Sequence, residues 1–83
     1  MSTERSKHLR LSDYDGDSAE IVRLDLPEAE AQRLKSMGIF EGQSIELCRT
    51  GDPLILTAAG GRVAIAREVA RQIVVQASDP RAA

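Results

Sequence analysis

Several short segments of the chain alternate apolar and polar residues, a pattern typical of strands that bury one face. The alternation is clearest in Ser44–Arg49, where Ile45 and Leu47 fall on one side of the strand and Cys48 on the other. Shorter segments rich in aliphatic or β-branched residues have the same character. They are Leu9–Leu11, Glu20–Leu24, Leu54–Thr57, Arg62–Ala66 and Ile73–Gln76. The pattern therefore predicts six short strands.

Between the second and third predicted strands, the apolar spacing becomes that of a helix. Ala31, Leu34 and Met37 recur every three residues and share one helical face. Pro27 suits a first helical turn, and Gly38 suits the left-handed conformation that often ends a helix. The sequence therefore predicts a helix from residue 27 to residue 37.

The predicted elements are joined by short segments rich in Gly, Pro, Asp and Ser, which favour turns. Gly60 and Gly61 lie between two alternating segments and predict a hairpin, and Arg67–Gln72 has room for only one or two helical turns. Short strands, tight turns and a single main helix predict a mostly-β fold that forms a small barrel, with a short helical turn near the C-terminus. A two-layer α+β arrangement is the alternative.

The chain of 83 residues has the length of one small domain. We expect this domain to span residues 9–76, with flexible tails at residues 1–8 and 77–83. The charged N-terminal residues are not followed by the apolar stretch that a signal peptide needs, and no segment has the length of a membrane span. The sequence therefore predicts a cytoplasmic protein.

Acidic and basic residues nearly balance, with 13 Asp and Glu against 11 Lys and Arg and a formal net charge of −2. Nucleic-acid binding depends on a basic surface, and only Tyr14 and Phe40 are available to stack on bases. We therefore expect no nucleic-acid partner. The basic residues that follow the predicted helix start are expected to form a solvated surface; they include Arg33, Lys35, Arg49, Arg62, Arg67 and Arg71.

The chain has few reactive side chains. His8 is the only histidine and Cys48 the only cysteine of the chain. A single cysteine cannot form an internal disulfide, and the two residues cannot supply a metal site with several His or Cys ligands. The chain also cannot hold both a His-dependent catalytic triad and a His-rich metal site. The aspartates of Asp13–Asp17 are dense enough to suggest a calcium loop. Counted from Asp13, however, the glycine falls at position 4 instead of 6, and Leu24 stands where the twelfth-position Glu is required. We therefore expect no catalytic residue, no metal site and no cofactor, and a protein that acts by contact.

Several longer motifs follow one another in a fixed order. The most specific are Met37–Ile39 followed by Gly42, and the later Gly51-Asp52-Pro53. The full set covers Leu9–Asp13, Gly16–Val22, Arg33–Leu47, Gly51–Leu56 and Gly61–Val75. In this order and spacing the chain resembles the FeoA family. It departs from the family before Gly51, where Thr50 alone follows the preceding strand and the family often has a longer segment.

The resemblance implies an SH3-like β-barrel that carries an inserted α-helix. It also implies a non-catalytic cytoplasmic accessory of bacterial ferrous iron uptake, whose partner is FeoB, a membrane permease with a cytosolic G-protein domain. Contact with the membrane would then be indirect, and assembly into a homo-oligomer is compatible with this role. The same fold forms the C-terminal module of DtxR-like metal-dependent repressors. The alternative is therefore an SH3-like interaction module of another system, such as a regulatory scaffold or a repressor-related protein.

Two segments are candidates for the surface that binds a partner. The first is the exit of the predicted helix, where the apolar Met37 and Phe40 flank Gly38. The second is the charged loop that ends in the Gly-Asp-Pro motif. Apolar anchors surrounded by polar residues are typical of the energetic centre of an interface, whereas packing into the core is the alternative for Met37 and Phe40. The predicted partner-binding residues are Met37, Gly38, Phe40, Arg49, Asp52 and Pro53.

Overall fold

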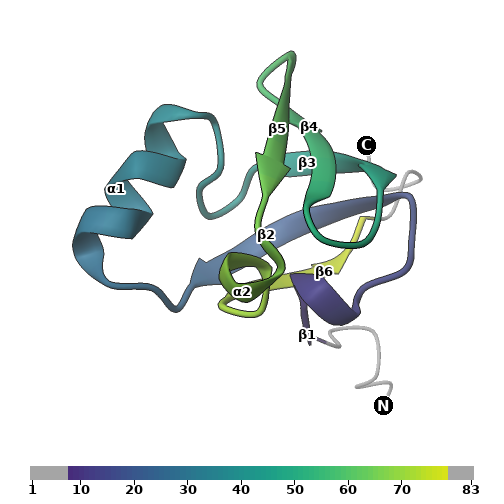
Figure 1. The fold of residues 1–83 in the computed structure, drawn as a ribbon, viewed down its shortest axis with the longest axis horizontal. Coiled ribbons are helices and arrows are strands. Elements are labelled where there is room, and N and C mark those ends of the chain that lie inside the picture. Colours follow the sequence, from purple (N-terminus) through teal and green to yellow (C-terminus); the bar gives the residue numbers. More distant parts are fainter. Residues whose placement is uncertain (1–7, 79–83) are drawn as a thin grey trace.

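A computed structural model describes residues 8–78 of the chain, so most of the two predicted tails lies outside the described residues. Strands, two α-helices and one 3-10 turn follow one another along this range (Figure 1). The elements are β1 (Leu9–Arg10), η2 (Leu11–Asp13), β2 (Ser18–Leu24), α1 (Glu28–Ser36), β3 (Ser44–Arg49), β4 (Leu54–Ala58), β5 (Gly61–Ile65), α2 (Arg67–Ala70) and β6 (Ile73–Ala77). Both predicted helices and all six predicted strands are present. Most of their ends differ from the predicted ends by one or two residues.

The strands form one antiparallel sheet in the order β1-β6-β2-β3-β4-β5. The prediction of a mostly-β fold is therefore confirmed. In Figure 1 the β4–β5 hairpin rises across the direction of β2 and β6, so that the sheet curls around its interior. The curled sheet has β1 and β5 as its edge strands, so hydrogen bonds do not close it into a complete barrel.

The core lies inside this curled sheet and is aliphatic. Alternate positions of the strands supply most of it, as the binary pattern of the sequence predicts. The connections contribute as well, because η2, α1, the helix exit and α2 each place a buried side chain in it. The buried cluster comprises Leu11, Ala19, Ile21, Leu34, Ile39, Ile45, Leu54, Leu56, Ala58, Ile65, Ala70, Ile73 and Val75.

Helix α1 is an insertion between β2 and β3, held to the core by its C-terminal end. The N–H of Ile39 donates to the Leu34 carbonyl at 3.0 Å, and the N–H of Gly38 donates to the Lys35 carbonyl at 3.0 Å. These two bonds form a Schellman motif, which requires a residue in a left-handed conformation. Gly38 supplies it with φ of +90°. Because Leu34 and Ile39 are both buried, the motif also folds the chain back onto the core.

The first predicted strand is shorter than expected, because its last residue starts a 3-10 turn. Leu11 accepts a hydrogen bond from the Tyr14 N–H at 3.2 Å and is fully buried. The Tyr14 hydroxyl then donates to the Ser18 carbonyl at 2.6 Å. The turn directs Leu11 into the core, and the chain buries this side chain instead of continuing the strand. The next strand correspondingly begins at Ser18, two residues before its predicted start.

The hairpin between β4 and β5 has a tighter turn than the glycine pair suggests. Ala58 pairs with Gly61, so the two-residue turn consists of Ala59 and Gly60. Both turn residues have positive φ, +52° and +82°, as a type I′ turn requires. Gly61 therefore belongs to the strand and not to the turn.

Candidate interaction surface

The structure separates the two apolar residues predicted at the helix exit. Met37 caps the C-terminal end of α1, is half-buried and packs against the core. Phe40 keeps 38% of its surface exposed, although Ile39 beside it is fully buried. The core alternative therefore holds for Met37, whereas Phe40 presents an aromatic ring to solvent. Gly38 lies between them and is itself buried.

Gly38 is closely covered by the β4–β5 turn. A Cβ atom placed on Gly38 would lie 2.6 Å from the Cβ of Ala59, well inside van der Waals contact. Gly42 has nearly the same backbone conformation, with φ of +86°, and a Cβ placed there would meet nothing within 4 Å. Gly38 is therefore required both by its backbone conformation and by the lack of space.

The β3–β4 loop is exposed along its whole length, as is Arg49, the last residue of β3 before it. The Asp52 side chain ties the loop to α2, because Asp52 Oδ1 accepts a hydrogen bond from the Arg67 N–H at 3.0 Å. Arg67 is the first residue of α2, so the Asp52 carboxylate satisfies an N–H that has no partner within the helix. The Asp52–Pro53 peptide bond is cis.

The helix exit and the β3–β4 loop lie at opposite ends of β4. The exit packs on Ala59, just after β4, whereas the loop leads into Leu54 at the start of this strand. At a rise of about 3.3 Å per residue, the four steps from Leu54 to Ala58 span about 13 Å. The six predicted partner-binding residues thus form two groups, and their role in binding stays a prediction.

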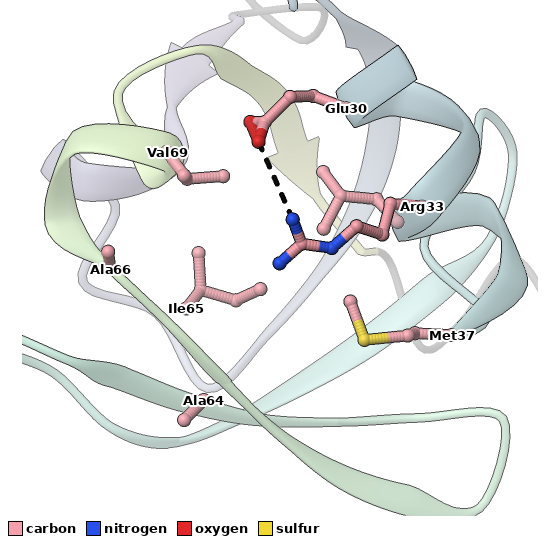
Figure 2. A pocket seen from close by; sticks show the side chains of 8 residues that line it. Glu30, Arg33, Met37, Ala64, Ile65, Ala66 and Val69 are labelled. Carbon is pink, nitrogen blue, oxygen red and sulfur yellow. Dashed lines mark ion pairs between the residues drawn. The ribbon is translucent and has the colours of Figure 1, made fainter.

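A hollow with a volume of about 230 Å³ lies between α1, β5 and α2, and we call it the α1–β5 groove (Figure 2). Glu30 and Arg33 lie on the helix side, and their long ion pair of 3.7 Å is drawn across the hollow in Figure 2. Its lining residues are Glu30, Arg33, Leu34, Met37, Ala64, Ile65, Ala66 and Val69. Of these lining residues, only Met37 is among the residues that the sequence predicts to bind a partner. The short Ala64 and Ala66 side chains at the end of β5 are the signal that could have indicated the groove.

A second hollow, with a volume of about 290 Å³, lies between η2 and the β3–β4 loop. Polar groups of both segments border it, including Asp13, Asp15 and Thr50, together with Arg67 of α2. Tyr14 also lines it. Burial raises the pKa of the Tyr14 hydroxyl, and the neighbouring charges of Asp15 and Asp17 raise it further.

The remaining reactive residues are dispersed. His8 is exposed ahead of β1, and Cys48 is exposed on β3, where its sulfur lies 3.3 Å from Thr57 Oγ1. Within residues 8–78, no three His, Cys, Asp or Glu side chains come together in a way that could hold a metal ion. Neither of the helices in this range has the length and apolar character needed to cross a membrane.

Asp25, just after β2, forms ion pairs with arginines of β1 and β2. Its carboxylate accepts hydrogen bonds from Arg23 at 2.8 Å and from Arg10 of β1 at 3.0 Å. The bond from Arg23, followed by that from Arg10, lowers the pKa of the Asp25 carboxyl below its ordinary value. All three side chains are well exposed to solvent, so the network contributes modestly to stability.

A curled, six-stranded antiparallel sheet with a helix inserted between β2 and β3 defines the molecule as a small SH3-like β domain. Comparison of the sequence with known families is more specific. Residues 10–77 match the FeoA domain, and the chain belongs to this family. None of the curated proteins compared with the chain matches it.

Three solved structures show the same fold. The crystal structure of an iron uptake regulatory protein, FeoA, is 27% identical, with a TM-score of 0.76 over 84% of this chain and 97% of that chain. The solution structure of FeoA from Chlorobium tepidum is also 27% identical, with a TM-score of 0.79 over 86% of this chain and 71% of that chain. FeoA from Stenotrophomonas maltophilia, complexed with zinc and described as a prokaryotic SH3 domain protein, is 26% identical. Its TM-score is 0.66 over 80% of this chain and 87% of that chain.

Proposed function

We propose that this protein is a non-catalytic accessory of bacterial ferrous iron uptake. The observation that supports this most is the match to the FeoA domain over residues 10–77, nearly the whole described range. For the S. maltophilia protein, activation of ferrous iron transport is the suggested role. In this proposal the chain is cytoplasmic, carries no resident cofactor, and binds the cytosolic G-protein domain of a FeoB-like permease.

A protein of this kind acts by differential binding. It can favour one conformation of the permease only if it binds that conformation more tightly than the others. The proposed contact surface combines the helix exit, Met37, Gly38 and Phe40, with the loop residues Arg49, Asp52 and Pro53. Phe40 is the strongest candidate for an anchor, because its ring is exposed and aromatic residues are enriched at the centres of interfaces.

The affinity of the protein for the cytosolic domain of the permease from the same organism tests this proposal. We expect Phe40→Ala to lower the affinity about tenfold, which corresponds to about 1.4 kcal/mol. Arg49→Glu should lower the affinity as well. Arg71→Glu makes the same charge change at the exposed residue that follows α2, and it should leave the affinity unchanged. Binding by wild type that is undetectable with and without nucleotide on the permease would contradict the proposed partner. Binding that Phe40→Ala leaves unchanged, in a folded variant, would remove the helix exit from the proposed surface.

A further inference from the structure

The outer edge of β5 has free hydrogen-bonding groups. Among the strands of residues 8–78, β5 pairs with β4 alone, and the hairpin register is fixed by the pairing of Ala58 with Gly61 around the two-residue turn. In an antiparallel pair, hydrogen-bonded and non-hydrogen-bonded positions alternate from this closing pair. Arg62 and Ala64 therefore occupy non-hydrogen-bonded positions, and their N–H and C=O groups point away from β4. None of the described loop and turn hydrogen bonds within residues 8–78 uses these four groups.

The α1–β5 groove lies directly along this edge. Ala64 and Ile65 both line it, although adjacent residues of a strand point to opposite faces of the sheet. A hollow that touches both must border the edge of the strand and not one face alone. Leu34 of α1 and Met37 at the C-terminal end of this helix line the opposite side. Met37 can be followed there in Figure 2. The arrangement is an edge strand and a helix with an open space between them.

The chemistry of the groove differs between its inner and outer sides. The inner side is apolar, because Leu34, Met37, Ile65 and Val69 line it. The outer side carries one carboxylate and two guanidinium groups. Glu30 and Arg33 line the groove and form a long contact of 3.7 Å, with the Arg33 side chain 74% exposed. Arg62 is exposed beside the groove on the outer face of β5, so the two arginines outnumber the carboxylate.

We propose that the α1–β5 groove binds an extended segment of a partner protein in which apolar and acidic residues alternate, and that this segment adds to β5 as a further strand. Strand addition uses the main-chain groups of the free edge for affinity and side-chain pockets for specificity. Alternate residues of the segment would point to the inner side, onto Ile65 and Met37. The residues between them would point outward, where a carboxylate opposite Arg62 forms a favourable cross-strand pair.

A second copy of this chain fits the edge less well. Its own β5 would bring another Arg62 and no carboxylate, so the charges would not be complementary. The groove itself is small, with a volume of about 230 Å³. A short extended segment matches this size. The inference concerns β5 and does not depend on the permease being the partner.

Peptide binding to the full-length, ¹⁵N-labelled protein tests the proposal. The probe is the blocked peptide Ser-Val-Glu-Val-Glu-Val-Ser, which has the required alternation. We expect a Kd on the order of 10⁻⁴ M and amide shifts centred on Arg62 and Ala64. Two matched peptides should bind at least about tenfold more weakly: one with Lys in place of Glu, and one of the same composition in the order Ser-Val-Val-Val-Glu-Glu-Ser. Equal binding of all three peptides, or shifts confined to other elements, would overturn the proposal.

Two variants separate the edge from the charge. Ala64→Pro removes the outward N–H but is compatible with an edge strand, because that N–H does not face β4; we expect it to abolish the amide shifts. Arg62→Glu should reverse the preference, so that the Lys peptide binds more tightly than the Glu peptide, while Arg71→Glu should leave the preference unchanged. A reversal cannot result from unfolding. An unchanged preference in Arg62→Glu would contradict the proposal. So would a doubling of the molecular mass at higher protein concentration, if it came with shifts of the β5 amides in the absence of peptide, since a second copy would then occupy the groove.

Discussion

The exit of α1 and the β3–β4 loop both turn at a glycine but are held in the fold in different ways. Each contains a glycine with positive φ, Gly38 in the exit and Gly51 in the loop. At the exit, Gly38 is buried under Ala59, and the next residue enters the core. In the loop, the space around Gly51 is open, and one hydrogen bond to Asp52 provides the side-chain anchor. A glycine-containing turn in the sequence therefore predicts backbone conformation, whereas tertiary packing decides how much stability the turn contributes.

The largest effect is expected for Gly38→Ala. The left-handed conformation costs an alanine about 1–2 kcal/mol, and the overlap with the Ala59 Cβ adds about 1–3 kcal/mol of overpacking. We therefore expect a loss of about 3 kcal/mol in the free energy of unfolding, measured by urea denaturation. Gly42→Ala is the matched control and should cost only the conformational part, about 1–2 kcal/mol. Equal losses in both variants would show that the packing at the exit contributes nothing.

A double-mutant cycle isolates the contact between the exit and the hairpin turn. Ala59→Gly removes the methyl group that a side chain at residue 38 would meet at 2.6 Å. Gly38→Ala should therefore cost about 1 kcal/mol less in the Ala59→Gly background than in wild type. The same cycle made with Gly42→Ala should be additive. A coupling of zero for Gly38 would mean that the helix exit and the turn are independent.

Asp52→Ala tests the side chain that anchors the loop to α2. Loss of the hydrogen bond to the Arg67 N–H should reduce the free energy of unfolding by about 1 kcal/mol, since the bond is exposed and caps a helix of only four residues. Hydrogen exchange of the α2 amides should accelerate more than that of the β2 amides. Asp15→Ala, which removes an exposed aspartate outside the loop, is the control. A loss of 3 kcal/mol or more would erase the contrast between the two regions.

Phe40→Ala should change stability by only about 0.5 kcal/mol, because the ring is substantially exposed. The melting temperature and the amide spectrum should remain close to those of the wild type. This small effect is what makes the variant suitable for the binding measurement proposed above. A large loss of stability would place Phe40 with the packed part of the exit.

Acid should lower the stability of the protein through Asp25, which lies outside both the helix exit and the β3–β4 loop. Its pKa is lowered in the folded state by hydrogen bonds from Arg23 and Arg10, so its contribution is present above the ordinary pKa of an aspartate and is lost as the pH falls through the lowered value. Asp25→Asn should therefore flatten the acid side of the stability curve and leave the difference between Gly38→Ala and Asp52→Ala unchanged. Denaturation of each variant over a series of acidic pH values measures this. If the free energy of unfolding of Asp25→Asn fell as steeply with acid as that of the wild type, another carboxyl group would be responsible for the acid sensitivity.

The presence and type of the elements could be predicted from the sequence, because alternation, helical spacing and turn residues are local signals. Strand order is different, since it depends on pairs such as Ile21 with Val75 that are far apart in the chain. The register shifts at Val22 and Cys48 also depend on how each strand pairs with its neighbour, and they were not predicted.

Among the candidate surface residues, the sequence could identify segments but not their exposure. Ile39 and Phe40 are adjacent and both apolar, yet one is in the core and the other faces solvent. The Schellman motif decides between them by turning the chain at Gly38. The α1–β5 groove escaped prediction for a related reason, because it is formed by elements that meet only after β5 has found its place at the edge of the sheet.

The position of β6 has a consequence for how the protein is made. Within residues 8–78, β6 is the last strand along the chain, yet it lies between β1 and β2 and brings Ile73, Val74 and Val75 into buried positions. During translation, the sheet therefore lacks an inner strand until residue 77 has left the ribosome. Up to that point β1 has no neighbour, and one side of β2 is unpaired. Nascent chains stalled before residue 73 should consequently stay accessible to chaperones and proteases.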